Sequence, residues 1–176
     1  MRLLICFFFL LVFACYKNQQ SPIIDDNRDY ASDFFLASNK EIIKIEDLMI
    51  DSLIKLSSQE FIRDSTGIRY LINKKHDQLK SIMAKEGDVV QVAYDCVVFE
   101  NVNSFNDVTM LDTLVFQIGY SKQMKGVNYA IKLLKVGESA KIIIPSYLGF
   151  GVSGYGELVP PYSTLLLNIK LLNVKS

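Results

Sequence analysis

The chain has 176 residues, and its 19 basic and 19 acidic side chains leave it with no net charge. At this length one domain with appendages is expected, and such a domain can bury a full hydrophobic core. No cluster of basic residues with interleaved aromatics occurs, so nucleic acid is not a predicted partner.

Residues 1–15 have the composition of a targeting segment. Arg2 precedes an apolar run, residues 3–13, that is too short to span a bilayer as a permanent helix. The run ends in Leu-Val-Phe-Ala-Cys, which resembles a bacterial lipobox and implies cleavage before a lipidated Cys15. Acyl chains contribute about 0.8 kcal/mol per buried methylene, which is enough for stable anchoring. No other apolar run approaches ~18 residues, so lipid is the only membrane anchor expected. The implied location is the periplasmic side of the cell envelope, at the inner or outer membrane. An ordinary secretory signal cleaved nearby is the alternative.

Residues 16–38 are mostly polar and are predicted to form a flexible tether. Cleavage would remove Cys6 and lipid would occupy Cys15, which leaves Cys96 without a disulfide partner. Cys96 alternates with valines in a strand-like run, and we expect a small core residue rather than a nucleophile. The only histidine, His76, has no Cys or His companions, so neither a metal nor a cofactor is predicted.

Residues 39–60 are predicted to hold an amphipathic helix that begins near Asn39. Its apolar side chains recur at helical spacing, at Ile42, Ile45, Met49, Leu53 and Leu56, with Leu48 beside them. An isolated helix of this length is marginal in water, so its apolar side needs a partner. The chain's own domain is the expected partner. A second copy, in a homodimer formed through residues 39–56, is the alternative.

Residues 61–176 are expected to form the main domain. Alternating apolar residues predict strands near 68–72, 89–99, 114–118, 140–144 and 164–171, and helical spacing predicts a short helix over 122–134. Strands outnumber helices and are joined by short turns. This pattern favours an α+β fold in which a short helix covers one face of an antiparallel sheet.

The longest loop predicted within the main domain lies between its last two strands. It contains four glycines, four aromatic residues and the pair Pro160-Pro161. Loops of this length are uncommon in compact domains and are usually functional. The segment is therefore the first candidate for a binding site.

This part of the chain resembles the FKBP-type (immunophilin) peptidyl-prolyl cis-trans isomerases. The residues that carry the resemblance keep the family's order and spacing: Val136-Gly137-Glu138, Ala140-Lys141, Pro145-Ser146, Gly149-Phe150-Gly151, Gly154, Pro160-Pro161 and Ser163-Thr164-Leu165. The match extends from about Gly67 to Leu172. It implies a half-wrapped antiparallel sheet with a short helix across its concave face, and isomerisation of X-Pro bonds in proline-containing polypeptides. The layout is also similar to FKBP-like lipoproteins of bacteria, including accessory lipoproteins of gliding motility.

The resemblance also assigns a substrate pocket. Tyr94 would lie at its edge, Phe105 would form an aromatic wall, Met124 would offer a backbone N–H to a ligand carbonyl, Val127 would form the floor and Phe150 would face the prolyl ring. For several of these side chains simple core packing is the alternative. The complete set implied by the resemblance is Tyr94, Phe105, Asn106, Leu114, Met124, Val127, Phe150, Tyr155, Val159 and Leu167.

Three positions depart from the family's pattern. Val127 stands where the family usually has tryptophan, Phe150 where it has tyrosine, and Asn106 where it has aspartate. Loss of the tyrosine hydroxyl removes a hydrogen bond of about 1–3 kcal/mol, which is roughly a 5- to 150-fold change in rate. The sequence thus predicts a slow prolyl isomerase that assists folding of exported proteins. The alternative is a non-catalytic binding or chaperone module of an envelope machine such as that of gliding motility.

Overall fold

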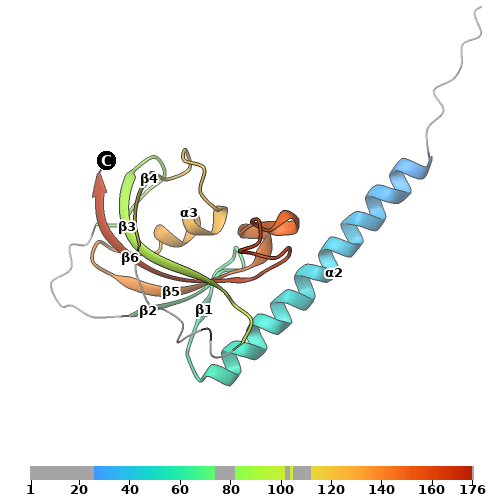
Figure 1. Ribbon diagram of the computed structural model, residues 1–176, viewed down its shortest axis with the longest axis horizontal. Helices are drawn as coiled ribbons and strands as arrows, with labels where there is room; N and C mark the ends of the chain where they lie inside the picture. The colour runs from blue at the N-terminus through green and yellow to red at the C-terminus, as the bar shows by residue number, and fades with distance from the viewer. Residues whose placement is uncertain (1–25, 74–81, 102–103, 105–111, 176) are drawn as a thin grey trace, which may run out of the picture. The chain divides into compact units, whose positions relative to one another are not determined.

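The computed structural model describes residues 26–73, 82–101, 104 and 112–175 (Figure 1). The predicted signal segment, residues 16–25 of the predicted tether, and His76 lie outside these residues. The chain divides into two compact units, Met1–Asn39 and Lys40–Ser176. In the described part of the first unit, the rings of Phe34 and Phe35 pack edge to face with their centroids 6.1 Å apart. None of the helices in the described ranges is long and apolar enough to cross a membrane.

The described part of the second unit is built on one antiparallel sheet of six strands in the order β1-β2-β5-β6-β3-β4. The five predicted strands are confirmed, and the two-residue strand β1 was not predicted. Strand β6 continues past Leu171 to Lys175 because it pairs with β3 as far as Val89. The strands are β1 Ile62–Arg63, β2 Arg69–Asn73, β3 Val89–Val98, β4 Asp112–Gln117, β5 Ser139–Ile144 and β6 Leu165–Lys175.

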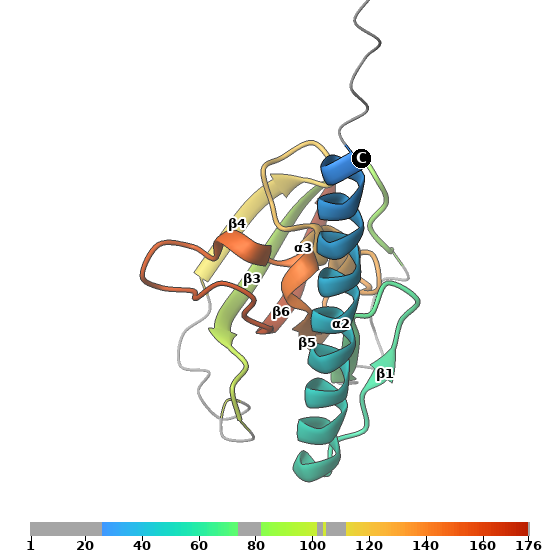
Figure 2. The ribbon, with the colours of Figure 1, turned by 90° about the vertical axis from the view of Figure 1, so that its right-hand side faces the viewer.

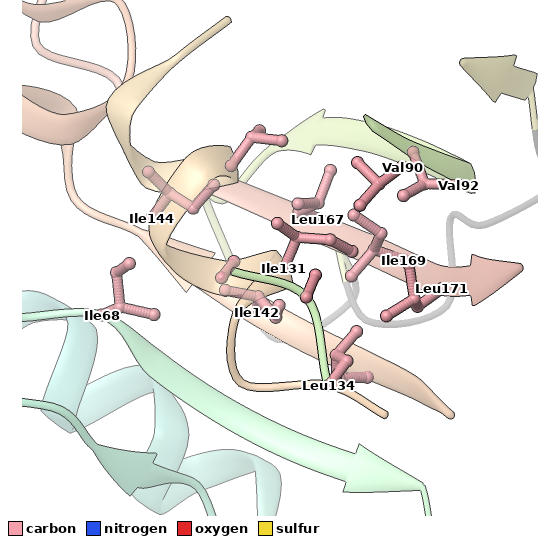
Figure 3. Close-up of a cluster of buried hydrophobic side chains, with 14 of the residues drawn as sticks. Ile68, Val90, Val92, Ile131, Leu134, Ile142, Ile144, Leu167, Ile169 and Leu171 are labelled. Atoms are coloured by element: carbon pink, nitrogen blue, oxygen red, sulfur yellow. The ribbon is translucent and has the colours of Figure 1, made fainter. Parts of the chain in front are cut away.

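The main core lies on the inner face of the sheet, under the helix α3, Lys125–Ile131 (Figures 1 and 3). Strand alternation places Ile142 of β5 opposite Leu167 of β6, and both side chains are fully buried. Gly126 allows α3 to approach the sheet closely, because a Cβ there would clash with Ile144. The predicted α+β class, with a short helix on an antiparallel sheet, is confirmed.

Helix α3 is shorter than the predicted 122–134. The N–H groups of Lys132, Leu133 and Leu134 donate to carbonyls three residues back, at 3.3, 3.1 and 3.2 Å. Such bonds are typical of a tightened final turn rather than of continuing α-helix. The apolar spacing that extended the prediction is real, since Leu134 is fully buried.

The N-terminal helix α2, Asp26–Ser57, begins well before the predicted Asn39. Residues 26–38 are therefore helical, and the prediction of a flexible tether over 16–38 is wrong for that part. Polar composition suggested a tether, but residues 26–57 contain no glycine or proline to interrupt a helix.

The second unit includes the part of α2 from Lys40 onward, and this part covers the outer face of the sheet. Ile50 is fully buried in a cluster with Phe99, Ile143 and Leu166, which point away from the inner core. The chain's own domain is thus a partner of this helix, as expected, but through a different side of the helix.

The predicted apolar stripe of α2 is mostly exposed. The side of the helix that meets the sheet carries Glu46, Asp47 and Ile50 instead. The prediction failed because the buried carboxylate of Glu46 and the partly buried one of Asp47 satisfy polar groups of the domain. Hydrophobic periodicity does not register such a role. The exposed apolar residues of the stripe are Ile45, Leu48, Met49 and Leu56, at 59, 61, 42 and 70%.

An ion network joins this helix to the first two strands. The guanidinium of Arg69, only 1% exposed, lies 2.8 Å from Asp47 and 2.9 Å from Asp51. Arg63 of β1 also reaches Asp47, at 2.9 Å. Strand β1 consequently lies beside the C-terminal half of α2 (Figure 2).

Candidate active site

A cavity of about 1000 Å³ opens on the inner face of the sheet. Strands β3, β4 and β6 form one side of it, α3 forms the floor, and the segment between β5 and β6 forms another side. We call this segment, residues 145–164, the pocket loop. The lining is mostly apolar: Val92, Tyr94, Cys96, Val98, Leu114, Met124, Val127, Phe150, Tyr155, Leu158, Val159, Leu165, Leu167 and Ile169, with Asp95, Val97, Asp112, Lys122 and Gln123.

Strand register brings together the residues that line the strand side of the cavity. Val92 of β3 pairs with Leu114 of β4, and Cys96 of β3 pairs with Leu167 of β6. Side chains of paired residues emerge on the same face of a sheet, and every second residue of a strand does so too. Tyr94, between Val92 and Cys96 on β3, therefore points to the same side. Three neighbouring strands therefore present one continuous apolar surface.

Helix α3 and the residue before it line the floor of the cavity. Val127 is 5% exposed and lies among the lining residues. Met124 precedes the first helical residue with φ −53° and ψ 139°. Its carbonyl accepts from Val127 and Asn128, whereas no backbone bond of its own N–H occurs within the described ranges. A lining residue of the cavity thus has a backbone N–H without a backbone acceptor among these residues.

The pocket loop is ordered by short helical turns and internal hydrogen bonds. It contains two 3₁₀ turns, η3 Ser146–Leu148 and η4 Gly151–Ser153. The N–H of Tyr162 donates to Gly151 O at 2.8 Å, and that of Tyr155 donates to Val159 O at 2.8 Å. Gly154 (φ 62°) is required at its position, since a Cβ there would clash with the carbonyl of Val159.

An aromatic wall results from this loop structure. The rings of Phe150 and Tyr155 stack at 5.0 Å between centroids and 26° between planes. Tyr155 is 57% exposed, so its ring closes the cavity from the solvent side, while Phe150 is half-buried. Two loop residues thus form one stacked aromatic pair at the cavity.

Most of the residues predicted for the pocket come together here. Tyr94, Leu114, Met124, Val127, Phe150, Tyr155, Val159 and Leu167 all line the one cavity. Phe105 and Asn106 lie outside the described residues. The individual roles proposed for all these residues stay predictions.

The sequence reasoning missed other lining residues. Lys122 and Gln123 precede α3, and Leu158, 77% exposed, lies on the pocket loop. Proximity to Met124 and Val159 in the sequence was the available signal. Cys96, predicted to be a core residue, packs against the core but also lines the cavity.

The thiol of Cys96 is not set up as a nucleophile. Burial, with a smaller contribution from the charge of Asp95, raises its pKa to about 11. At neutral pH the side chain is therefore a neutral, weakly polar part of the wall. The arrangement as a whole can bind an apolar ring, stack it on aromatics and donate to a carbonyl.

The same part of the chain is similar to known proteins. Residues 80–172 match the family model of FKBP-type peptidyl-prolyl cis-trans isomerase. FK506-binding protein 1 of Eremothecium gossypii is 35% identical over 91 residues, which are 51% of this chain and 79% of that protein. Peptidyl-prolyl cis-trans isomerase FKBP14 of Homo sapiens is 34% identical over 95 residues, 52% of this chain and 44% of that protein. The chain thus spans less than half the length of this human relative.

A solved structure supports the same fold. The crystal structure of FkpA from Escherichia coli superposes with a TM-score of 0.57 at 24% identity, covering 88% of this chain and 75% of that one. The match over residues 80–172, more than half of the chain, places it in the FKBP-type peptidyl-prolyl cis-trans isomerase family.

Proposed function

We propose that this chain is a peptidyl-prolyl cis-trans isomerase that assists folding of exported proteins, held by lipid at the periplasmic side of a bacterial envelope. The observation that carries the activity is the apolar cavity under the Phe150–Tyr155 wall, formed by a pocket loop inside the matched family region.

Such a cavity can lower the barrier without an acid, base or nucleophile. Rotation about an X-Pro bond breaks amide conjugation, at a barrier of about 18–20 kcal/mol. The twisted amide is less charge-separated than the planar one, so an apolar site binds it in preference, and preference for the transition state is catalysis. A 10⁴-fold acceleration requires about 5.5 kcal/mol of such preference.

The described residues divide this task. Val127 and the stacked rings of Phe150 and Tyr155 exclude water around the prolyl ring. The Met124 N–H holds a carbonyl of the peptide. Because Phe150 has no hydroxyl, its ring contributes no hydrogen bond to the rotating amide, so we expect a slow enzyme.

The test is a prolyl cis/trans relaxation assay on the purified full chain and two variants. Phe150→Ala removes half of the wall, and we expect kcat/KM to fall about tenfold or more. Phe150→Tyr restores a hydroxyl donor, and we expect kcat/KM to rise at least about fivefold.

Val152→Ala is the matched control, because Val152 lies on the same loop, is 61% exposed and does not line the cavity. It should leave the rate unchanged. Relaxation at the uncatalysed rate with folded wild type and with Phe150→Tyr would reject the enzyme.

The lipid anchor rests on residues 2–15, with their basic start, apolar run and lipobox-like end. We expect Cys15 to be diacylated and the protein to fractionate with membranes. Mass spectrometry of the mature N-terminus tests this, with Cys15→Ala as the comparison. An unmodified N-terminus generated by cleavage at another site would favour a secreted protein.

The exposed stripe of α2, formed by Ile45, Leu48, Met49 and Leu56, supports a homodimer through residues 39–56. A monomer rarely leaves four apolar side chains together on one helix unless they meet something. Sedimentation of the full chain in detergent measures the mass. A monomer at all concentrations would leave the stripe without a partner copy.

The second candidate function is a non-catalytic binding or chaperone module of an envelope machine, such as that of gliding motility. The aliphatic floor at Val127 and the absent hydroxyl at Phe150 favour it. Binding of a proline-containing peptide, measured by NMR titration, with no acceleration of isomerisation would select this candidate.

A further inference from the structure

A buried carboxylate of α2 holds the pocket loop. Glu46 is 7% exposed and accepts three hydrogen bonds: from the Ser146 N–H at 2.6 Å, from Ser146 Oγ at 2.8 Å and from Thr164 Oγ1 at 2.6 Å. Among the described residues no salt bridge reaches Glu46, so these neutral donors alone compensate its burial. Hydrogen bonds to an ionised acceptor are roughly twice as strong as neutral ones.

The partners of Glu46 are the two ends of the pocket loop. Ser146 begins η3 and Thr164 immediately precedes β6, and both are buried, at 4% and 2% exposed. All loop residues that line the cavity before β6 lie between them. A single side chain thus clamps the points where the loop leaves and re-enters the sheet.

Glu46 itself does not line the cavity. Its effect on a bound peptide must pass through the loop, whose internal bonds Tyr155 N–Val159 O and Tyr162 N–Gly151 O hold the aromatic wall. Without the clamp, those bonds would hold the loop together but not fix it relative to the floor at Val127.

We propose that Glu46 is a positioning residue for the prolyl substrate, acting from the N-terminal helix through Ser146 and Thr164 to hold the pocket loop over the floor. The inference rests on the proposed function. It makes the C-terminal half of α2 a part of the active-site scaffold in addition to a connection to the rest of the chain.

A loop that samples open states has a specific kinetic signature. The apparent affinity for the peptide falls in proportion to the fraction of free enzyme whose loop is in the binding-competent state. Once the peptide is bound, the loop is held in that state, so the rate of the bound complex changes little. Glu46→Gln should therefore raise KM about tenfold and leave kcat near that of wild type. A merely structural role would reduce the amount of folded enzyme, which lowers apparent kcat and leaves KM unchanged.

The experiment measures kcat and KM by NMR exchange on a tetrapeptide with one X-Pro bond, using the full chain. Amide hydrogen exchange on the free protein is the second readout. In Glu46→Gln the amides of Tyr155, Val159 and Tyr162 should exchange about tenfold faster, with those of β3 unchanged. Thr164→Val removes one donor at constant shape and should shift KM in the same direction by less.

Glu41→Gln is the matched control, since Glu41 lies on the same helix, is 63% exposed in its side chain and pairs only loosely with Lys44 at 3.9 Å. It should match wild type in all readouts. An unchanged KM in both Glu46→Gln and Thr164→Val, or exchange that rises equally in β3 and in the loop, would overturn the proposal.

Failure of the proposed function has a different outcome. A wild type that does not accelerate the tetrapeptide rejects the isomerase but still allows the dissociation constant of the peptide and the exchange rates to be measured. A weaker dissociation constant with faster loop exchange in Glu46→Gln would then still support the positioning role.

Discussion

The two faces of the sheet are covered by helices in opposite ways. On the inner face, α3 buries Val127, Ala130 and Ile131 in a core that is mostly aliphatic. On the outer face, α2 buries Ile50 between carboxylates that reach defined donors. Apolar burial is non-directional, whereas a buried hydrogen-bonded carboxylate accepts only one arrangement of partners. The inner face therefore supplies most of the cohesion, and the outer face supplies alignment.

The largest effect is expected on the inner face. Ile142 is fully buried opposite Leu167, so Ile142→Ala should leave a cavity and cost about 4 kcal/mol of unfolding free energy. Urea unfolding followed by circular dichroism measures it. Val115→Ala, at a 60% exposed position of β4, is the control and should cost no more than about 1 kcal/mol. Similar costs for both variants would contradict the assignment of cohesion to this face.

The outer face should respond to loss of its buried cation. Arg69→Leu leaves Asp47 and Asp51 with only the exposed Arg63 as a partner, and we expect a cost of about 3 kcal/mol, since water still reaches the half-exposed Asp51. The control is Arg63→Leu, which removes a 53% exposed arginine from the same carboxylates and should cost less than about 1 kcal/mol. Equal costs would mean that burial of Arg69 adds nothing to the alignment.

A smaller effect is expected at high pH, at the cavity wall. The pKa of Cys96 is raised to about 11 from an ordinary value of 9.0, because burial disfavours the thiolate. The unfolded chain then ionises first, so stability is complete below about pH 9 and declines as the pH rises toward 11. Between pH 8 and pH 10.5 wild type should lose about 2 kcal/mol of unfolding free energy relative to Cys96→Ala, measured by urea unfolding at both pH values. Parallel pH profiles for the two proteins would contradict burial of the thiol.

The inner face was predictable because its signal is local. Apolar residues recur at every second position, at Ile142 and Ile144 and at Leu165, Leu167 and Ile169, and these side chains face the core. The glycine-rich loop carries the family's motif, and the resemblance to that family assigned the pocket residues, eight of which line the cavity. Lys122 and Leu158 were missed because their contact with the cavity depends on the path of the chain after it leaves a regular element.

The outer face was not predictable because its signal is distant. The partners of Glu46 lie 100 and 118 positions away in the sequence. Hydrophobic periodicity placed Ile45 and Met49 inside, whereas Glu46 and Ile50, one position further along, are the buried residues. One residue turns a helix by about 100°, so a one-position error selects a different face.

The smallest effect tests that exposed stripe. Ile45 is 59% exposed on α2, so Ile45→Gln should change the unfolding free energy by no more than about 0.5 kcal/mol in a monomer, whereas Ile50→Ala on the buried side should cost about 3 kcal/mol. If the cost is larger, urea unfolding at two protein concentrations shows whether the stripe is covered by a second copy or by the chain itself. If Ile45→Gln costs more than about 1 kcal/mol and wild-type stability rises with concentration, a second copy covers the stripe, because association stabilises by mass action. A concentration-independent loss would instead contradict the exposure of Ile45 and return the helix to the orientation predicted from its hydrophobic periodicity.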